Sequence, residues 1–378
     1  MTVAARSALL PVYPPTRVTF VAGSGATLVD TEGREYLDFA AGIAVVALGH
    51  RHPAVLAAAR AQLDRVWHVS NLFGSEPAQE LAQVLSPRFG GAQAFFCNSG
   101  AEANEAALKY ARKATGKQGV LALEQGFHGR TTGALAATGQ PAKRTPFEPL
   151  LPGVRFVPPN DVDALRSAMT DEMGLVLLEP VLGEGGVVPL EREFVAAARE
   201  LDALLAFDEV QTGVGRTGTF FAFEQLGVRP DLVTLAKGLA NGLPIGCLLV
   251  ADDAVGTFAP GDHGSTFGGN PVACAAALAV CEAIDYELLA RVRSNGERLR
   301  EGLRSLPHVL EVRGAGLLIG AELDAPAQPF VDAALDAGLV CLTSGEKVLR
   351  LAPPLIVGER DVDRALEVLT EVLTNEPA

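Results

Sequence analysis

The chain has 378 residues, 48% of them apolar and 20% charged, which is the composition of a globular protein with a sizeable core. Its net charge of −14 repels phosphate backbones and anionic lipid headgroups, which excludes nucleic acids and membrane surfaces as expected partners. The longest apolar stretches, residues 39–49 and 271–281, are shorter than the roughly 18 residues that a membrane-spanning helix needs.

The expected compartment is the cytoplasm. Residues 1–16 contain several prolines and lack the long apolar run of a secretory signal. The five cysteines are odd in number, have no C-x-x-C spacing, and mostly lie among apolar neighbours, as reduced thiols do. They are Cys97, Cys247, Cys274, Cys281 and Cys341.

In chain order, three short strand-like runs come first and predict a small antiparallel meander over residues 17–21, 26–30 and 35–39. Helical and strand patterns then alternate, which predicts an α/β layer with a mostly parallel sheet. The expected helices are 54–66, 77–88 and 101–113, and the expected strands are 119–123, 175–179, 204–208, 232–235 and 245–250.

The last third of the chain predicts a smaller α+β unit. An alanine-rich run indicates one helix over residues 272–303, and the elements expected after it are strands at 316–322 and 348–351 and helices at 330–337 and 361–373. We therefore expect an N-terminal segment, 1–50, that belongs to the small domain, a large domain, 51–280, and a C-terminal small domain, 281–378.

Lys237 is the first residue that suggests chemistry. It follows a buried strand and is bracketed by apolar and small residues, and desolvation there would favour the neutral amine that forms a Schiff base. Asp208 closes another buried strand, where a carboxylate can hold a pyridinium nitrogen protonated. The alternatives are a lysine that reaches solvent from a strand end and an aspartate that caps a turn.

Two segments are candidates for binding a phosphate. Residues 99–102 read Ser-Gly-Ala-Glu, a capping box whose small residues leave the amides of Gly100 and Ala101 accessible at a helix N-terminus. Residues 263–271 crowd glycine and hydroxyl residues, including Ser265 and Thr266, before another helix. A simple helix cap and a simple loop are the alternatives.

Arginine side chains suggest a substrate with carboxylates, which Arg binds in a planar, bidentate way. Arg130 lies in a glycine-rich turn after a strand, and Arg350 interrupts an apolar strand, where it needs a partner. Glu184 is either the ion-pair partner of one of these arginines or a solvated loop residue. Phe127 is either a core residue or an aromatic side chain that stacks on the ring of a cofactor.

Residues 213–218 match the dinucleotide motif G-x-G-x-x-G. The sequence after them does not begin a small-residue helix, and no acidic ribose partner follows at about 20 residues. A nicotinamide cofactor is therefore not expected.

Taken in order, these motifs resemble the class III aminotransferases from about residue 14 to residue 373. The matching segments are Asn98–Glu105, Phe127–Thr131, Asp208–Gly213, Leu235–Gly238 and Ser265–Pro271. The resemblance implies the fold of pyridoxal-phosphate-dependent transferases of fold type I, which is aspartate-aminotransferase-like. It has a large α/β domain with a mostly parallel sheet and a smaller α+β domain. It also implies a homodimer with active sites at the subunit interface.

The resemblance also implies a role for each candidate residue. Lys237 would carry pyridoxal 5′-phosphate and shuttle a proton, and no metal is expected. Asp208 would pair with the pyridine nitrogen, Gln211 with the phenolic oxygen, and Phe127 would stack on the ring. The phosphate would be bound by Gly100 and Ala101, and by Thr266 from the partner subunit. The substrate would be held by Arg130, Ser265, Glu184 and Arg350, with Glu184 covering Arg350 while the amino donor is bound.

Within the family, the motifs lean toward members that transfer the 5-amino group of N2-acetylornithine to 2-oxoglutarate in arginine biosynthesis. The alternative donors are ornithine, 4-aminobutyrate, succinyl-diaminopimelate and the carrier-linked amine of lysine synthesis. A binding protein that keeps the fold without catalysis is the remote alternative, and intact Lys237 and Asp208 argue against it. Two positions depart from the family pattern: Leu182 replaces a glutamine, and Gly74 replaces an aromatic residue. We expect both to affect specificity more than chemistry.

Overall fold

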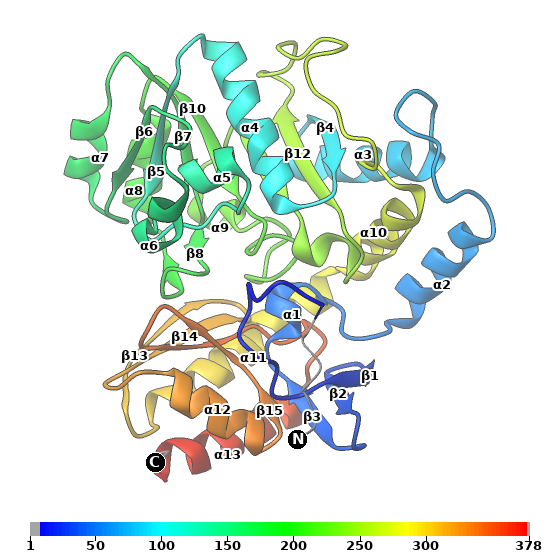
Figure 1. Ribbon diagram of the computed structural model, residues 1–378, viewed down its shortest axis with the longest axis vertical. Coiled ribbons are helices and arrows are strands. Elements are labelled where there is room, and N and C mark those ends of the chain that lie inside the picture. Colours follow the sequence, from blue (N-terminus) through cyan, green and yellow to red (C-terminus); the bar gives the residue numbers. More distant parts are fainter. Residues whose placement is uncertain (1–7, 376–378) are drawn as a thin grey trace.

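The computed structural model describes residues 8–375, and Figure 1 shows their arrangement. The N-terminal meander is confirmed as an antiparallel sheet of β1 (Phe20–Ser24), β2 (Thr27–Asp30) and β3 (Glu35–Asp38). β15 (Leu339–Val340) extends this sheet by pairing in parallel with β3. The first and last parts of the chain therefore share one sheet.

The central sheet has seven strands in the order β4-β12-β11-β10-β7-β5-β6. β12 runs antiparallel to both of its neighbours, and every other pairing is parallel, as the alternating pattern predicted. The strands are β4 (Ala92–Cys97), β5 (Gly119–Leu123), β6 (Val154–Val157), β7 (Met173–Leu178), β10 (Leu204–Asp208), β11 (Leu232–Leu235) and β12 (Gly246–Ala251). β4 and β6 were not predicted from the sequence.

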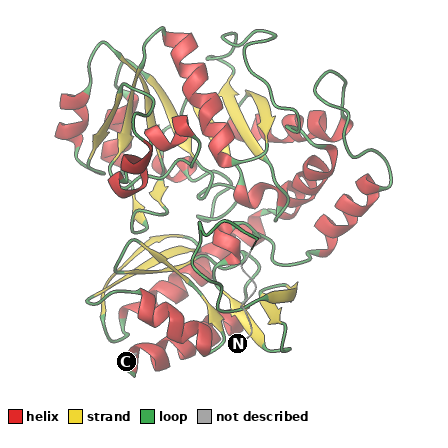
Figure 2. Cartoon of the chain, in the orientation of Figure 1, coloured by secondary structure: helices red, strands yellow, loops and turns green. Residues whose placement is uncertain are grey.

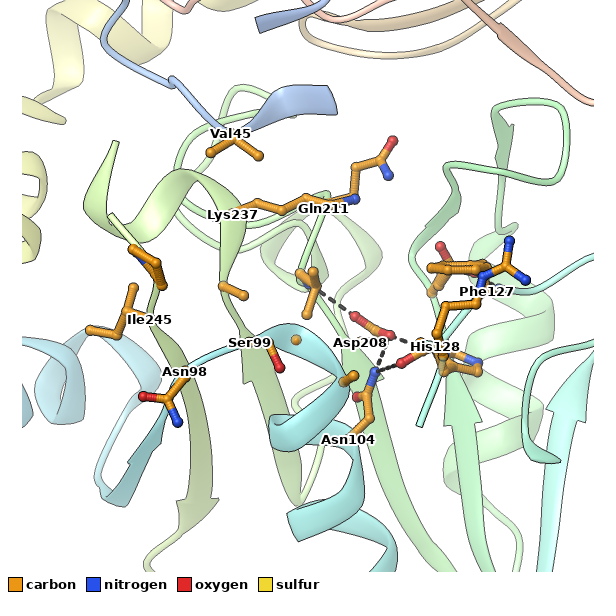
Figure 3. A pocket seen from close by; sticks show the side chains of 18 of the residues that line it. Val45, Asn98, Ser99, Asn104, Phe127, His128, Asp208, Gln211, Lys237 and Ile245 are labelled. Atoms are coloured by element: carbon orange, nitrogen blue, oxygen red, sulfur yellow. Dashed lines mark hydrogen bonds and ion pairs between the residues drawn. The ribbon is translucent and has the colours of Figure 1, made fainter. Parts of the chain in front are cut away.

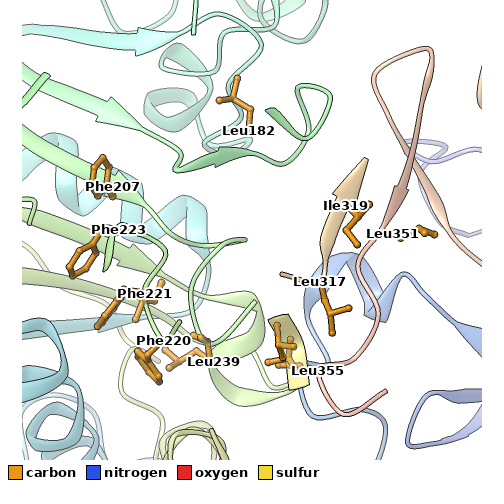
Figure 4. Close-up of a cluster of buried hydrophobic side chains, with 14 of the residues drawn as sticks. Leu182, Phe207, Phe220, Phe221, Phe223, Leu239, Leu317, Ile319, Leu351 and Leu355 are labelled. Carbon is orange, nitrogen blue, oxygen red and sulfur yellow. The ribbon is translucent and has the colours of Figure 1, made fainter. Parts of the chain in front are cut away.

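Both faces of this sheet are covered, so its central strands, such as β7 and β12, are buried along their whole length. In β10, Ala206 packs in the cluster under α4 (Gly100–Thr115), while Leu205 and Phe207 join the larger core on the other face. Figure 2 shows helices on the two sides of the sheet, and Figure 4 shows part of the larger core, including Phe207. The remaining helices of this region are α1 (Ala41–Ala44), α2 (Pro53–Leu63), α3 (Glu76–Phe89), α5 (Thr132–Ala136), α6 (Pro141–Arg144), α7 (Val162–Ala168), α8 (Arg192–Arg199), α9 (Phe223–Leu226), and the 3₁₀ turns Thr145–Phe147 and Lys237–Ala240.

A third sheet, in the order β13-β14-β17-β16, lies in the lower body of Figure 1 with the N-terminal meander. Helices pack on it and on each other, as α11 does with β13 and α13. Its elements are β13 (Val309–Ala315), β14 (Leu318–Leu323), β16 (Leu342–Ser344), β17 (Val348–Leu351), α11 (Tyr286–Arg304), α12 (Gln328–Asp336) and α13 (Glu359–Thr374). A two-stranded hairpin of β8 (Val181–Leu182) and β9 (Val188–Pro189) completes the described strands.

The helix predicted over residues 272–303 is wrong as one element, because the structure divides it into α10 (Pro271–Ala283) and α11. Ile284 leaves helical geometry with ψ of 84°, and the Asp285 side chain accepts a hydrogen bond from the amide of Leu288. An aspartate N-cap starts the second helix, a signal that the alanine-rich pattern concealed.

Among the described helices, none is long and apolar enough to cross a bilayer. The division of the chain at residues 50 and 280 stays a prediction.

Candidate active site

The candidate site lies where the parallel strands of the central sheet end. The segments that follow β4, β7, β10 and β11 meet at this edge, as expected for an open α/β sheet. They surround a cavity of about 420 Å³, shown in Figure 3. Seven of the residues expected at the site line it: Gly100, Ala101, Phe127, Arg130, Asp208, Gln211 and Lys237.

Lys237 is half-buried at the second position after β11, in the 3₁₀ turn, with φ of 35°. A non-glycine residue in this region is strained, and such strain is found at functional sites. Burial is the largest influence on its amine and lowers its pKa; Glu184 opposes this, and Arg350 lowers the pKa further. A lower pKa increases the fraction of the amine that is neutral and nucleophilic.

Asp208 is held by a buried hydrogen-bond network (Figure 3). Its Oδ2 accepts from His128 Nδ1 at 2.7 Å and from Asn104 Nδ2 at 2.7 Å, and its Oδ1 accepts from the amide of Val210. Asn104 is fixed in turn because its Oδ1 accepts from Thr234. Burial alone would lower the pKa of His128, but the hydrogen bond and charge of Asp208 outweigh it and raise that pKa.

Glu179 is a second buried carboxylate and is the first residue after β7. Its Oε1 accepts from the amide of Phe127 at 2.8 Å, and its Oε2 accepts from the amide of Gly183 at 3.3 Å. Burial raises the pKa of Glu179 to about 7. Glu179 thereby ties the turn that carries Phe127 to the loop that carries Glu184.

The N-terminus of α4 faces the cavity with free donors. Ser99 caps the helix by accepting from the amide of Glu102 at 3.2 Å, as predicted. The Glu102 carboxylate bonds Asn98 rather than returning to Ser99, so half of the expected capping box is formed. In the described residues, no hydrogen bond uses the amides of Gly100 and Ala101, which leaves them available to an anion.

Arg350 has the partner that its place in an apolar strand required. It is buried and forms an ion pair with Glu184, and its Nη1 also donates to the carbonyl of Gly183 and to Gln211 Oε1. Burial alone would raise the pKa of Glu184, but the charge and hydrogen bonds of Arg350 outweigh burial and lower it. Gln211 Nε2 reaches Glu184 at 3.5 Å, so Gln211 connects the cavity to this ion pair.

The residues of the 263–271 loop lie apart from the cavity of their own chain. Ser265 Oγ accepts hydrogen bonds from Asn98 Nδ2 at 3.1 Å and from the amide of Gly268. Asn98 lines the cavity, so Ser265 contacts a cavity-lining residue without lining the cavity itself. Thr266 is exposed and does not line the cavity. Within one copy of the chain, the structure therefore does not bring Thr266 to the other predicted phosphate-binding residues.

The two departures from the family pattern have different surroundings. Leu182 is fully buried in the main core (Figure 4), next to the loop that carries Glu184. Gly74 lines a separate surface cavity with Asn71 and Phe73.

The glycine motif at residues 213–218 packs into the interior of the protein, where Arg216 is buried and donates hydrogen bonds to the carbonyls of Leu317 and Pro353.

His128, Asn104 and Glu179 are site residues that sequence reasoning did not assign. His128 and Asn104 fall inside the motifs that carry the resemblance, but nothing in the local pattern shows that both contact Asp208. The signal that could have found them is that each is a polar residue within a motif, next to apolar positions. A buried polar side chain needs a hydrogen-bond partner.

Comparisons with known proteins identify the family to which the chain is similar. The family described as Aminotransferase class-III matches residues 11–373. The acetylornithine aminotransferase of Mycolicibacterium smegmatis is 50% identical, over 96% of this chain and 95% of its own. The N-acetylornithine aminotransferase of Stenotrophomonas maltophilia has 37% identity and a TM-score of 0.84, over 96% of both chains. An ornithine aminotransferase of Toxoplasma gondii, described with PLP at its active site, has 32% identity and a TM-score of 0.93, over 97% of this chain and 92% of its own.

Proposed function

The chain belongs to the class III aminotransferase family, and from this premise we propose that it transfers the 5-amino group of N2-acetylornithine to 2-oxoglutarate. The products are N-acetylglutamate 5-semialdehyde and glutamate, and the reaction serves arginine biosynthesis. The observation that carries the proposal is the single cavity lined by Lys237, Asp208 and Phe127. The choice of donor is supported by the acetylornithine aminotransferases that the chain resembles.

The residues at the cavity fit pyridoxal 5′-phosphate. Lys237 lines the cavity with an amine whose pKa is lowered by burial, and Phe127 offers an aromatic wall. Asp208 Oδ1 uses one acceptor position on Val210 and retains one for a pyridinium N–H, while Oδ2 is saturated by His128 and Asn104. The unused amides at the start of α4 suit the phosphate. When bound, this cofactor supplies an electron sink that stabilises negative charge on the substrate carbon.

In the proposed mechanism, Lys237 Nζ acts twice. It holds the cofactor at rest, and it then moves a proton from the substrate carbon that bears the amino group. His128 and Asn104 fix Asp208 so that its charge stays directed into the cavity. Because the network is buried, its charges are only weakly screened by water.

The Arg350–Glu184 pair lets one site accept two different substrates. Glutamate and 2-oxoglutarate carry a carboxylate next to the reacting carbon, and Arg350 would bind it after Glu184 moves away. N2-acetylornithine has no charge next to its reacting carbon, so Glu184 would then stay on Arg350. Arg130 and Ser265 would bind the end of N2-acetylornithine that carries its carboxylate.

We also propose that the chain works as a cytoplasmic homodimer in which Thr266 reaches the phosphate of the partner's site. Thr266 is exposed beside Phe267, which is 60% exposed. Trp67 and Phe73 are 65% and 73% exposed on a nearby segment, and apolar surface of this kind is typical of an interface. The small domain formed by residues 1–50 and 281–378 would then cover the large domain.

The proposed donor can be tested with a panel of amines. Single-turnover absorbance of the cofactor-loaded protein is expected to change fastest with N2-acetylornithine. Ornithine, 4-aminobutyrate, succinyl-diaminopimelate and carrier-linked lysine complete the panel. A faster reaction with carrier-linked lysine would assign the enzyme to lysine synthesis instead. No reaction with any amine would support the alternative of a non-catalytic binding protein.

Capture of pyridoxal 5′-phosphate by Lys237 is expected to reach half its maximal rate below pH 10.5, the ordinary pKa of a lysine amine. The neutral amine is the nucleophile, so the rate rises through the folded-state pKa, and burial lowers that pKa. The measurement is borohydride trapping after brief mixing of the cofactor-free protein at a series of pH values. Lys237→Ala reports the background from other lysines, and a midpoint at the ordinary value would contradict the proposed environment.

A further inference from the structure

Two cations share the ring of Phe127. Lys143 Nζ lies 5.0 Å from the ring centroid, and Arg130 Cζ lies 5.6 Å from it. Phe127 and Arg130 line the cavity, and Lys143 comes from the short helix α6. Two cations at one ring form a concentrated positive charge at the side of the candidate site.

Neither cation is neutralised by a carboxylate. In the described part of the chain, no ion pair includes Arg130 or Lys143, and Lys143 donates a hydrogen bond to the neutral amide oxygen of Gln140. Burial lowers the pKa of Lys143, Glu184 opposes this, and the neighbouring charges of Arg130 and Arg350 lower the pKa further. A half-buried cation repelled by two others is best stabilised by an added anion.

We propose that Lys143 binds the distal carboxylate of both substrates together with Arg130, and so determines specificity for donors that carry this group. The inference rests on the proposed function and deepens it. In N2-acetylornithine the α-carboxylate lies at the opposite end from the reacting amine, and 2-oxoglutarate has its second carboxylate at the end away from the ketone. In the proposed function, Arg350 binds the carboxylate next to the reacting carbon. The distal carboxylate therefore needs a separate binding site.

The two basic residues differ in what they offer a carboxylate. Arg130 presents a planar fork, while Lys143 presents a point charge on a flexible stem, which suits two substrates of different length. The next residue, Arg144, provides a natural comparison, because its Cζ lies 4.2 Å from the ring centroid of Phe156 rather than that of Phe127. Proximity in sequence alone therefore does not place a cation at this site.

The test uses Lys143→Met, which keeps an apolar stem against Phe127 and removes only the charge, with Arg144→Met as the matched control. N-acetylputrescine, which is acetylornithine without its carboxylate, isolates the interaction as a double-mutant cycle. We expect Lys143→Met to raise the half-saturating concentration of acetylornithine about tenfold, with little change in its limiting rate or in the half-saturation of N-acetylputrescine. Lys143→Arg should restore most of the loss.

Calorimetric titration of the cofactor-loaded protein with glutarate, an unreactive dicarboxylate, measures binding without turnover. About tenfold weaker binding in Lys143→Met, with Arg144→Met close to wild type, is the expected result. Unchanged glutarate binding, or equal losses for acetylornithine and N-acetylputrescine, would overturn the inference. The wild-type reaction with acetylornithine tests the proposed function separately, since a protein could fail that reaction and still lose glutarate affinity through Lys143.

Discussion

Replacing Lys237 by alanine is expected to lower acetylornithine turnover by more than about a thousandfold, because the amine that holds the cofactor and moves the proton is removed. The protein should stay folded, since an amine whose charged form is disfavoured by partial burial contributes little to stability. Steady-state rates, the visible absorbance of the loaded protein and a thermal melt would be measured together.

Lys113→Ala is a suitable control for this experiment. Lys113, which lies on α4, forms a surface ion pair with Asp262, and such pairs contribute little to stability. Acetylornithine turnover by the Lys113→Ala variant should stay within about twofold of the wild type. A Lys237→Ala protein that keeps a tenth or more of the wild-type rate would show that another group performs the chemistry.

Replacing Arg350 by alanine is expected to slow the half-reaction with glutamate about a hundredfold or more, and to slow the half-reaction with acetylornithine by less than about tenfold. Truncating one partner of a buried charge pair costs on the order of 2–5 kcal/mol, and each 1.4 kcal/mol is a factor of ten. Glutamate needs Arg350 for the carboxylate next to the reacting carbon, whereas acetylornithine has none there. Single-turnover absorbance with each substrate separates the two half-reactions.

Glu184→Gln is the companion variant for Arg350→Ala. It leaves Arg350 in place but removes the carboxylate that covers it, so the glutamate half-reaction should be kept while discrimination between substrates falls. Equal losses in both half-reactions of Arg350→Ala would contradict the assigned role. A stability loss alone would appear as a lower melting temperature with unchanged rate ratios.

The buried charges of the site are organised around Asp208 and Glu179. His128 binds the first carboxylate, and the amides of Phe127 and Gly183 bind the second. Through Glu179, these contacts link Phe127 to the loop that carries Glu184. This arrangement fits the proposed cofactor pocket, with Asp208 fixed at its base, and the proposed movement of Glu184 beside it.

The sequence alone determined the features that depend on local chemistry. The alternation of apolar segments predicted the parallel sheet, and the ends of β10 and β11 predicted Asp208 and Lys237 at one edge. The Ser99 cap was also predicted, because a cap depends on residues within one helical turn. These signals are short in range, so they can be recognised without knowing the fold.

The tertiary structure decided which distant residues meet. His128 and Asn104 contact Asp208 across 80 and 104 positions, and Lys143 reaches the ring of Phe127 from another helix. No local pattern encodes such contacts, because they arise from the order in which strands pair and from the burial that pairing imposes. The break between α10 and α11 was missed for a related reason: an alanine-rich run favours helix on both sides of Asp285. The sequence predicted Lys237 and Asp208 as the candidate reacting groups, and the packing of the sheet determined which residues surround them.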